Sequence, residues 1–249
     1  MIIVKNSLQL SAMKDAGRIT AEALLEAREV LRAGMTTKEL DEKIHRYIKK
    51  CGAKPSFLGY SGFPGSACIS INDEVIHGIP SHRRVIKDGD LVKIDVGAYY
   101  RGYHGDSART YGVGNISDEA QRLIDETEAS FFEALKVMVA GNRIGDIGAA
   151  VQRRAEAAGY SVVREFVGHG IGASLHESPE VPNYGRASHG VRLCAGMTLA
   201  VEPMINEGGA AITTDRDGWT VRTADHKLSA HYENTVAITD NGPVLLTTV

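Results

Sequence analysis

Apolar residues recur at three- and four-residue steps near the start of the chain, which is the spacing of an amphipathic helix. This stripe predicts a helix over residues 8–33, with Gly34 after it as a left-handed cap. Thr36 and Glu39 have the three-residue separation of a capping box, so a second helix is expected to begin there and to stop at Gly52. The chain therefore opens with two helices joined by a short turn.

A longer apolar run further along the chain predicts a β-hairpin. Residues 88–106 read as a hydrophobic strand that ends on Asp95, a turn, and a return strand that reaches Asp106. A turn at Tyr100-Arg101 would place the two carboxylates directly opposite each other, with Cβ atoms about 4.5–5.5 Å apart. Like charges at that distance raise each other's pKa unless a cation lies between them. The hairpin is expected either to point its acids into solvent or to hold a counter-ion.

The remaining elements also carry acids at strand positions. The expected elements are a strand over 67–71, a helix from about Ser117 or Asp118 to Val139 with a capping box of Asp118 and Gln121, a helix over 145–158, and strands over 161–167, 197–206, 219–223 and 230–238. Glu202 lies in the 197–206 strand and Glu233 in the 230–238 strand. A hairpin-like return would bring Glu233 beside Glu202.

The landmarks of the first half recur 107 residues later, which indicates an internal repeat. Three glycines and one acid match without a gap, in the pairs Gly34 and Gly141, Gly52 and Gly159, Gly89 and Gly196, and Asp95 and Glu202. The two halves, over roughly 8–106 and 115–238, are expected to be related by a pseudo-twofold axis. Such an axis would bring Asp95 and Glu202 together.

Composition and charge exclude several classes of protein. With 43% apolar and 24% charged residues, the chain is typical of globular proteins, and its net charge of −3 gives no support for nucleic-acid binding. Its three cysteines are widely spaced without a Cys-x-x-Cys pattern, which argues against a disulfide framework and favours a reducing compartment. The sequence contains no run of about eighteen apolar residues, so no membrane-spanning helix is predicted. A cytoplasmic protein is expected.

Asp95, Asp106, Glu202 and Glu233 are expected to converge near the pseudo-twofold axis. Four bare carboxylates in one pocket are untenable, because desolvation and mutual repulsion both oppose their ionisation. Two divalent cations would balance their formal charge, and an oxygen-rich site with one imidazole suits Mn, Fe, Co or Zn. His169 lies between two glycines, where the backbone can approach a metal closely, so it is the expected nitrogen ligand. Two such metals can share a bridging hydroxide.

Several motifs together resemble those of type I methionine aminopeptidases, over essentially the whole chain. They are Ile69–Pro80, Ile94–Gly97, Gly102–Ala108, Gly168–Gly172 with His176 and Glu177, Val201–Met204, and Tyr232–Thr235. The resemblance implies the α+β pita-bread fold, in which two pseudo-twofold-related halves have a central antiparallel sheet covered by helices. It also implies a single catalytic metallopeptidase domain over residues 1–249.

The resemblance assigns roles that spacing alone does not. It implies metal ligands at Asp95, Asp106, His169, Glu202 and Glu233, with the attacking hydroxide between two divalent ions. Glu202 would also carry a proton from the nucleophile to the leaving amine. His176 would stabilise the oxygen of the tetrahedral intermediate, and His77 would contact the scissile amide or the departing amine.

A pocket for the methionine side chain follows from the same resemblance. Its expected lining is Phe57, Tyr60, Phe63, Cys68, His77, Leu175, His176 and Trp219. Aromatic rings and sulfur suit a thioether, which packs well at ring edges. One departure is Asn234, where family members often carry histidine after the last acid. Altered hydrogen bonding around the ligands is expected there, with the metals retained.

The implied function is removal of the initiator methionine from nascent polypeptides with a small second residue. Two divalent metal ions are the expected cofactors, and the sequence does not fix whether they are Co, Mn, Fe or Zn. A monomer of the short bacterial form is expected, acting on nascent peptide N-termini, with ribosome association left open and no membrane or sequence-specific nucleic-acid partner.

Two alternatives keep the fold and change the activity. An Xaa-Pro aminopeptidase or dipeptidase usually has a large N-terminal domain and a further histidine four residues before the ligand histidine, where this chain has Glu165. A non-catalytic binding module of the same fold would have lost ligands, whereas all five matching residues are present. Both alternatives are therefore less favoured than methionine removal.

Overall fold

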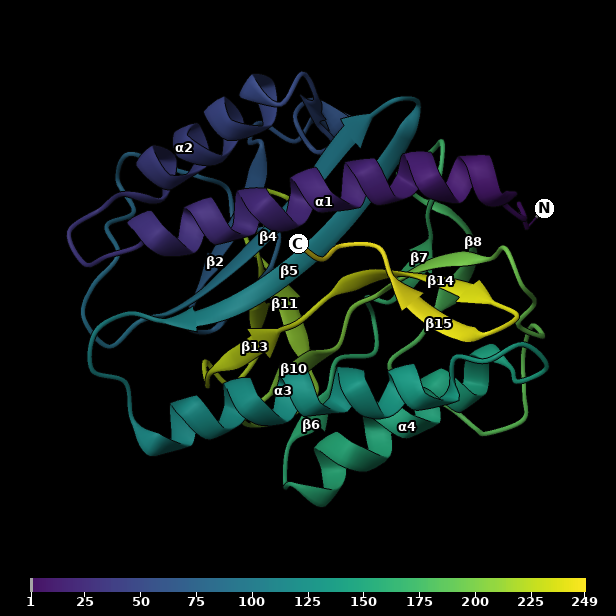
Figure 1. The fold of residues 1–249 in the computed structure, drawn as a ribbon. Helices are drawn as coiled ribbons and strands as arrows, with labels where there is room; N and C mark the ends of the chain where they lie inside the picture. The colour runs from purple at the N-terminus through teal and green to yellow at the C-terminus, as the bar shows by residue number, and fades with distance from the viewer. Residues whose placement is uncertain (1) are drawn as a thin grey trace.

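Two pairs of helices flank a set of antiparallel strands in the computed structural model, which describes residues 2–249 (Figure 1). One pair consists of α1 (Ser7–Val30) and α2 (Thr37–Lys50), above the strands in Figure 1. The other pair, below them, consists of α3 (Asp118–Val137) and α4 (Ile144–Ala157). A 3₁₀ turn, η1 (Tyr60–Gly62), precedes most of the strands. The α+β class expected from the sequence is confirmed.

The strands are mostly short and pair antiparallel. In chain order they are β1 (Lys54–Pro55), β2 (Ala67–Ile71), β3 (Glu74–Ile76), β4 (Leu91–Tyr100), β5 (Tyr103–Gly112), β6 (Ser161–Val162), β7 (Gly168–Gly170), β8 (Glu177–Val181), β9 (Thr198–Val201), β10 (Met204–Asn206), β11 (Ile212–Thr214), β12 (Val221–Thr223), β13 (Ser229–His231), β14 (Asn234–Thr239) and β15 (Gly242–Leu245). Within residues 2–249 they form four sheets, ordered β1-β4-β2 with β5 on β4, β13-β10-β6, β11-β12-β3, and β15-β14-β9-β7-β8. Mutual backbone hydrogen bonds between Ala108 and Glu233 connect the two halves of this layer.

The second helix begins as predicted, whereas α1 begins one residue before the predicted start and ends early. Thr36 Oγ1 accepts a hydrogen bond from Glu39 N (3.2 Å), and Glu39 Oε2 accepts one from Thr36 N (2.8 Å), so this capping box is confirmed. α1 ends at Val30 because Leu31 is already extended, with ψ 124°. The expectation that Gly34 caps this helix is therefore wrong. Gly34 has φ +85° and belongs to the turn that follows.

The third helix begins where it was predicted, at Ser117 and Asp118, but without the predicted capping box. Ser117 is the N-cap, and its hydroxyl accepts a hydrogen bond from Ala120 N at 3.1 Å. The capping box assigned to Asp118 and Gln121 is wrong, because Ser117 already satisfies the first turn. α3 ends two residues before the predicted end, and α4 begins and ends one residue early.

Four predicted strands are shorter than expected or interrupted, and the 219–223 strand is shortened to β12, Val221–Thr223. β6 covers only the start of 161–167. The 197–206 and 230–238 strands are split into β9 and β10 and into β13 and β14, with an acid at each break. Pro203 has no N–H to donate to a neighbouring strand, and its carbonyl accepts a hydrogen bond from Tyr232 N at 3.2 Å. The two breaks therefore face each other.

The long hairpin of β4 and β5 turns later than predicted. The turn residues are Arg101-Gly102, both with positive φ (51° and 89°), as two-residue hairpin turns favour. Asp95 pairs with Ala108, and Asp106 pairs with Gly97. The prediction that the two acids lie directly opposite each other is wrong. Because the register differs by two residues, both side chains still lie on one face of the hairpin, as diagonal neighbours.

The same hydrogen bonds recur at the spacing found in the sequence. Gly34 and Gly141 both have positive φ (85° and 100°), and their N–H groups donate to Ile86 O and Leu193 O respectively. Isolated β-bridges also repeat at this spacing, joining Thr36 to Val85 and Arg143 to Arg192. Positive φ at these glycines would be strained for other residues, so they fix the turns between helices and strands.

Each half has its own hydrophobic core, and a third cluster lies where the halves meet. Ile44 is fully buried in the core under α1 and α2, and Phe131 is fully buried in the core under α3 and α4. The third cluster contains Phe57 and Phe63 from the first half and Leu175 from the second. These residues form part of the wall of the pocket that both halves line.

Candidate active site

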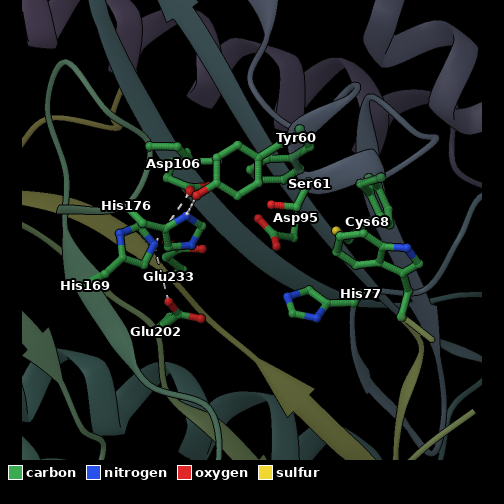
Figure 2. Close-up of a pocket in the computed structure, with 14 residues that line it drawn as sticks. Tyr60, Ser61, Cys68, His77, Asp95, Asp106, His169, His176, Glu202 and Glu233 are labelled. Atoms are coloured by element: carbon green, nitrogen blue, oxygen red, sulfur yellow. Dashed lines mark hydrogen bonds and ion pairs between the residues drawn. The ribbon is translucent and has the colours of Figure 1, made fainter.

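One pocket is lined by every site residue predicted from the sequence (Figure 2). Its lining is Phe57, Tyr60, Ser61, Phe63, Cys68, His77, Asp95, Asp106, His169, Leu175, His176, Glu202, Trp219 and Glu233. Ser61 was not predicted. It has φ 47° inside η1, between Gly59 and Gly62, and this pair of glycines was the available signal of a tight turn here.

Four strands and their breaks bring the acids together. Asp95 lies on β4 and Asp106 on β5, while Glu202 follows β9 and Glu233 precedes β14. The pairing of β9 with β14 and that of β10 with β13 share one register, which places Glu202 opposite Glu233 in the gap between them. The predicted return of Glu233 beside Glu202 is therefore present.

The imidazole of His169 lies among these carboxylates. Its Nε2 is 3.7 Å from Glu202 Oε1 and 4.0 Å from Asp106 Oδ2. One ligand atom each from Asp106, His169 and Glu233 lies within 4.8 Å of the others, and all three residues are buried. Such a group matches the spacing of donors around a shared ion.

The orphaned atoms of the acids fit a cation. Asp95 Oδ1, Asp106 Oδ1 and Glu233 Oε1 are buried and have no hydrogen-bond partner within the described residues. Buried carboxylate oxygens without partners are costly, because they lose hydration without compensation. Oxygen donors with one imidazole are the ligand set of divalent Mn, Fe, Co or Zn. The donor set therefore fits divalent metal ions.

The tautomer of His169 also suits metal binding. His169 Nδ1 lies 2.9 Å from its neighbour's carbonyl, Gly170 O, to which only a protonated nitrogen can donate. Nε2 then carries a lone pair directed at the acids. Hydrogen bonding of the far nitrogen to a carbonyl is the usual way in which a ligand histidine is oriented. Burial lowers the pKa of His169 to about 3, so the ring stays neutral.

Without a cation, the four acids bind protons more readily than exposed carboxyl groups do. Burial raises the pKa of Asp95 to about 7. The pKa values of Asp106, Glu202 and Glu233 are raised well above their usual range, first by burial and then by the neighbouring carboxylates. Arg109 opposes this at Glu233. Metal binding must therefore displace protons, and the affinity for metal should rise with pH.

Aromatic rings and a thiol form the other wall of the pocket. Trp219 contacts Phe63 edge to face, with ring centroids 5.1 Å apart, and lies 6.2 Å from His77. Cys68 on β2 pairs with Asp95 on β4, and burial raises its thiol pKa well above the usual value. Figure 2 shows Cys68 and His77 beside Asp95, away from His169. The pocket therefore has one end lined by carboxyl groups and an imidazole, and another end lined by apolar side chains.

Arg109 supports the acids from outside the pocket, and sequence reasoning missed it. Its guanidinium donates to Glu233 O and, at 2.9 Å, to Asn234 Oδ1, and it stacks 4.0 Å from the centroid of Tyr232. Asn234 Oδ1 also accepts a hydrogen bond from Thr247 at 2.9 Å. Asn234 therefore anchors the backbone beside Glu233.

A buried ion pair near His176 was also missed. Lys5 Nζ lies 2.6 Å from Glu177 Oε2, and both side chains are almost fully buried. The lysine stem passes so close to Gly172 that a Cβ there would meet Lys5 Cε at 2.6 Å. The N-terminal segment therefore holds the loop that carries His176.

The fold and these donors define a class of metallopeptidase. The model of metallopeptidase family M24 matches residues 11–240, and the chain belongs to this family. Within the described residues, no helix is long and apolar enough to cross a membrane.

Its relatives carry a more specific name. The chain is 54% identical to the methionine aminopeptidase of Clostridium perfringens over 249 residues, which is 100% of both chains. It is 50% identical to methionine aminopeptidase 1 of Bacillus subtilis, again over 100% of both. The crystal structure of methionine aminopeptidase from Thermotoga maritima superposes with a TM-score of 0.98 at 42% identity, covering 100% of both chains.

A more distant neighbour shares the fold. The prolidase from Pyrococcus furiosus superposes with a TM-score of 0.82 at 25% identity, and the match covers 99% of this chain and 66% of the prolidase. The fold is therefore the pita-bread fold expected from the sequence.

Proposed function

We propose that this chain removes the N-terminal methionine from nascent polypeptides with a small second residue, by hydrolysing the first peptide bond. The observation that carries the proposal is the two-ended pocket. Four carboxylates and one imidazole meet at one end, and rings and a thiol line the other. Full-length relatives named methionine aminopeptidase, up to 54% identical, support the same activity.

Asp95, Asp106, His169, Glu202 and Glu233 would hold divalent metal ions, for which Co, Mn, Fe and Zn are candidates. Two ions would balance the four carboxylates. When bound, such ions polarise a carbonyl and lower the pKa of a bound water toward neutrality.

Glu202 is the residue best suited to move a proton. It lies at a strand break, and its carboxylate is 3.7 Å from the ring nitrogens of both His169 and His231. Within the described residues, its side chain makes no hydrogen bond, and these two contacts are its only ion pairs. It would take a proton from the attacking water and deliver it to the departing amine.

Two further histidines would act on the substrate. His176 would donate a hydrogen bond to the oxygen that becomes negative in the tetrahedral intermediate. His77 would contact the scissile amide or the new amine. Burial lowers the pKa of His77 to about 4, so this imidazole is neutral and can bind without repelling a protonated amine.

The apolar end would bind the methionine side chain. A thioether gains favourable contacts at ring edges, which Phe63 and Trp219 supply, and the Cys68 thiol adds a soft neighbour. Phe57, Tyr60 and Leu175 complete this wall.

Peptide assays test the activity directly. Metal-free protein would receive Mn, Fe, Co or Zn in turn, with the tripeptide Met-Ala-Ser and an Xaa-Pro peptide as substrates. Methionine release from Met-Ala-Ser alone is expected. Activity on the Xaa-Pro peptide alone would instead indicate a prolidase-type enzyme. Silence on both peptides with all four metals would favour a non-catalytic binding module.

We further propose that residues 1–249 form one catalytic domain with related halves over roughly 8–106 and 115–238, acting as a cytoplasmic monomer. Sedimentation equilibrium tests the monomer. Co-sedimentation with ribosomes tests whether the chain associates with the site of its substrates.

A further inference from the structure

The hydroxyl of Tyr60 contacts one nitrogen of the His176 imidazole. Tyr60 Oη and His176 Nδ1 are 2.7 Å apart, and the two ring centroids are 5.2 Å apart (Figure 2). This distance is typical of a hydrogen bond. Within residues 2–249, it is the hydroxyl's one hydrogen bond to protein.

The backbone, more than burial, fixes the position of Tyr60. The Tyr60 side chain is 41% exposed, yet it lies in η1 between residues of unusual conformation. Gly59, Ser61 and Gly62 all have positive φ, and Phe63 N donates to Tyr60 O at 2.9 Å. A serine in this region of φ is strained, and such strain persists where the surrounding structure requires it.

The ring of His176 is also held by a second contact. Its centroid lies 4.1 Å from that of His169. The imidazole therefore has a neighbour from each half of the molecule, Tyr60 from the first and His169 from the second.

A neutral imidazole carries one N–H and one lone pair, and the partner of one nitrogen decides the state of the other. If Tyr60 donates to Nδ1, the proton must be on Nε2. If instead Nδ1 donates to the phenol oxygen, Nε2 presents a lone pair. Only the first arrangement lets His176 stabilise a negative oxygen.

We propose that Tyr60 is a positioning residue for His176: its hydroxyl donates to Nδ1 and so keeps the imidazole proton on Nε2, directed at the reacting carbonyl. This rests on the proposed function, and specifically on the role given there to His176. The ring of Tyr60 would line the methionine pocket, and the hydroxyl would have this second, separate role.

The tautomer can be measured without substrate. Zinc-loaded protein would be labelled with ¹⁵N-histidine, and the His176 signals identified by their loss in His176→Ala. We expect a pyridine-type shift for Nδ1 and a pyrrole-type shift for Nε2, with the opposite tautomer gaining population in Tyr60→Phe. A pyrrole-type Nδ1 in the unmodified protein would overturn the proposal.

Kinetics provide the second test, because Tyr60→Phe keeps the ring and removes only the hydroxyl. We expect kcat for Met-Ala-Ser to fall about tenfold with KM nearly unchanged, the size of one lost hydrogen bond. Affinity for a methionine phosphonate, which mimics the tetrahedral species, should fall by the same factor. The matched control is Tyr103→Phe, since Tyr103 Oη accepts a hydrogen bond from Gln9 at 2.9 Å outside the pocket. Its rates should not change.

A double-mutant cycle completes the test. In the His176→Ala background, Tyr60→Phe should have no further effect on kcat, because the hydroxyl acts through the imidazole. A full tenfold loss in that background would overturn the proposal. If the unmodified protein released no methionine, the proposed function would fail, while the ¹⁵N result would still report on the Tyr60–His176 contact.

Discussion

The two halves of the molecule place different side chains on one backbone plan. In the first half, Asp95 on β4 pairs with Ala108 on β5 in an unbroken hairpin. In the second half, the corresponding acid Glu202 faces Glu233 across the gap between two short ladders. An alanine in one half is therefore replaced by an acid in the other.

The difference continues two residues further along each strand. Gly97 pairs with Asp106 in the first half, and Met204 pairs with His231 in the second. Where the first half has the buried carboxyl group of Asp106, the second has the buried imidazole of His231. The continuous hairpin holds its acids on regular strands, whereas Pro203 interrupts the strand beside Glu202. The comparison teaches that one backbone plan can carry its acids on continuous strands in one half and at strand breaks in the other. The proposed function gives the proton-carrier role to an acid at such a break, Glu202.

The largest expected effect separates the two corresponding acids. Glu202→Gln should abolish turnover, by about a thousandfold or more, while the fold survives, because the amide cannot accept and return a proton. Asp95→Asn should act mainly through weaker metal binding and should recover in part at high metal concentration. Turnover measured against metal concentration checks both variants. Near-normal rates for Glu202→Gln would contradict the proton-carrier role, and with it the functional difference between Glu202 and Asp95.

A second prediction concerns stability. The second half's His176 loop depends on Lys5, whose pair with Glu177 is buried, so Lys5→Met leaves a buried charge unpaired and should cost about 3–5 kcal/mol. The matched control is Arg101→Met in the first half. It breaks an equally short pair with Asp15, but one that is exposed, and should cost at most about 1 kcal/mol. Urea unfolding measures both. Equal costs would show that the loop does not depend on this pair.

The residues behind these two predictions differ in how far they could be predicted from the sequence. The acids and His169 could be predicted, because acids in apolar strands and glycine-flanked residues are local patterns. The repeat could be predicted because its glycines and acids recur at one fixed spacing. The hairpin register was wrong by two residues, because a turn's position depends on which residues adopt positive φ. Lys5 and Glu177 are 172 residues apart, and Tyr60 and His176 are 116 apart. No local pattern relates such residues, since only the packing of the two halves brings them together.

A third prediction concerns His176, which the second half contributes to the pocket. His176→Ala should lower kcat for Met-Ala-Ser by about a hundredfold with a smaller change in KM, because its hydrogen bond forms with the intermediate. Steady-state kinetics over a range of peptide concentrations separates kcat from KM. A rise in KM alone would mean that the second half's histidine binds substrate and does not stabilise the intermediate.

The smallest effect is a difference in slope with pH, measured on metal-free protein. Asp95 has a folded pKa raised to about 7, so between about pH 4 and 7 its carboxyl is neutral when folded and ionised when unfolded. Folding then takes up a proton, and this group lowers the free energy of unfolding by about 1.4 kcal/mol per unit as pH rises.

His231 has the opposite sign, because burial lowers its pKa to about 3 and the unfolded chain binds its proton below about pH 6.5. Its contribution to stability is lost as pH falls. Asp95→Asn should therefore make the free energy of unfolding fall less steeply between pH 4 and 7, and His231→Gln should make it fall more steeply. Urea unfolding at several pH values measures both slopes. If both substitutions changed the slope of unfolding free energy against pH in the same direction, the opposite signs assigned to Asp95 and His231 would be wrong.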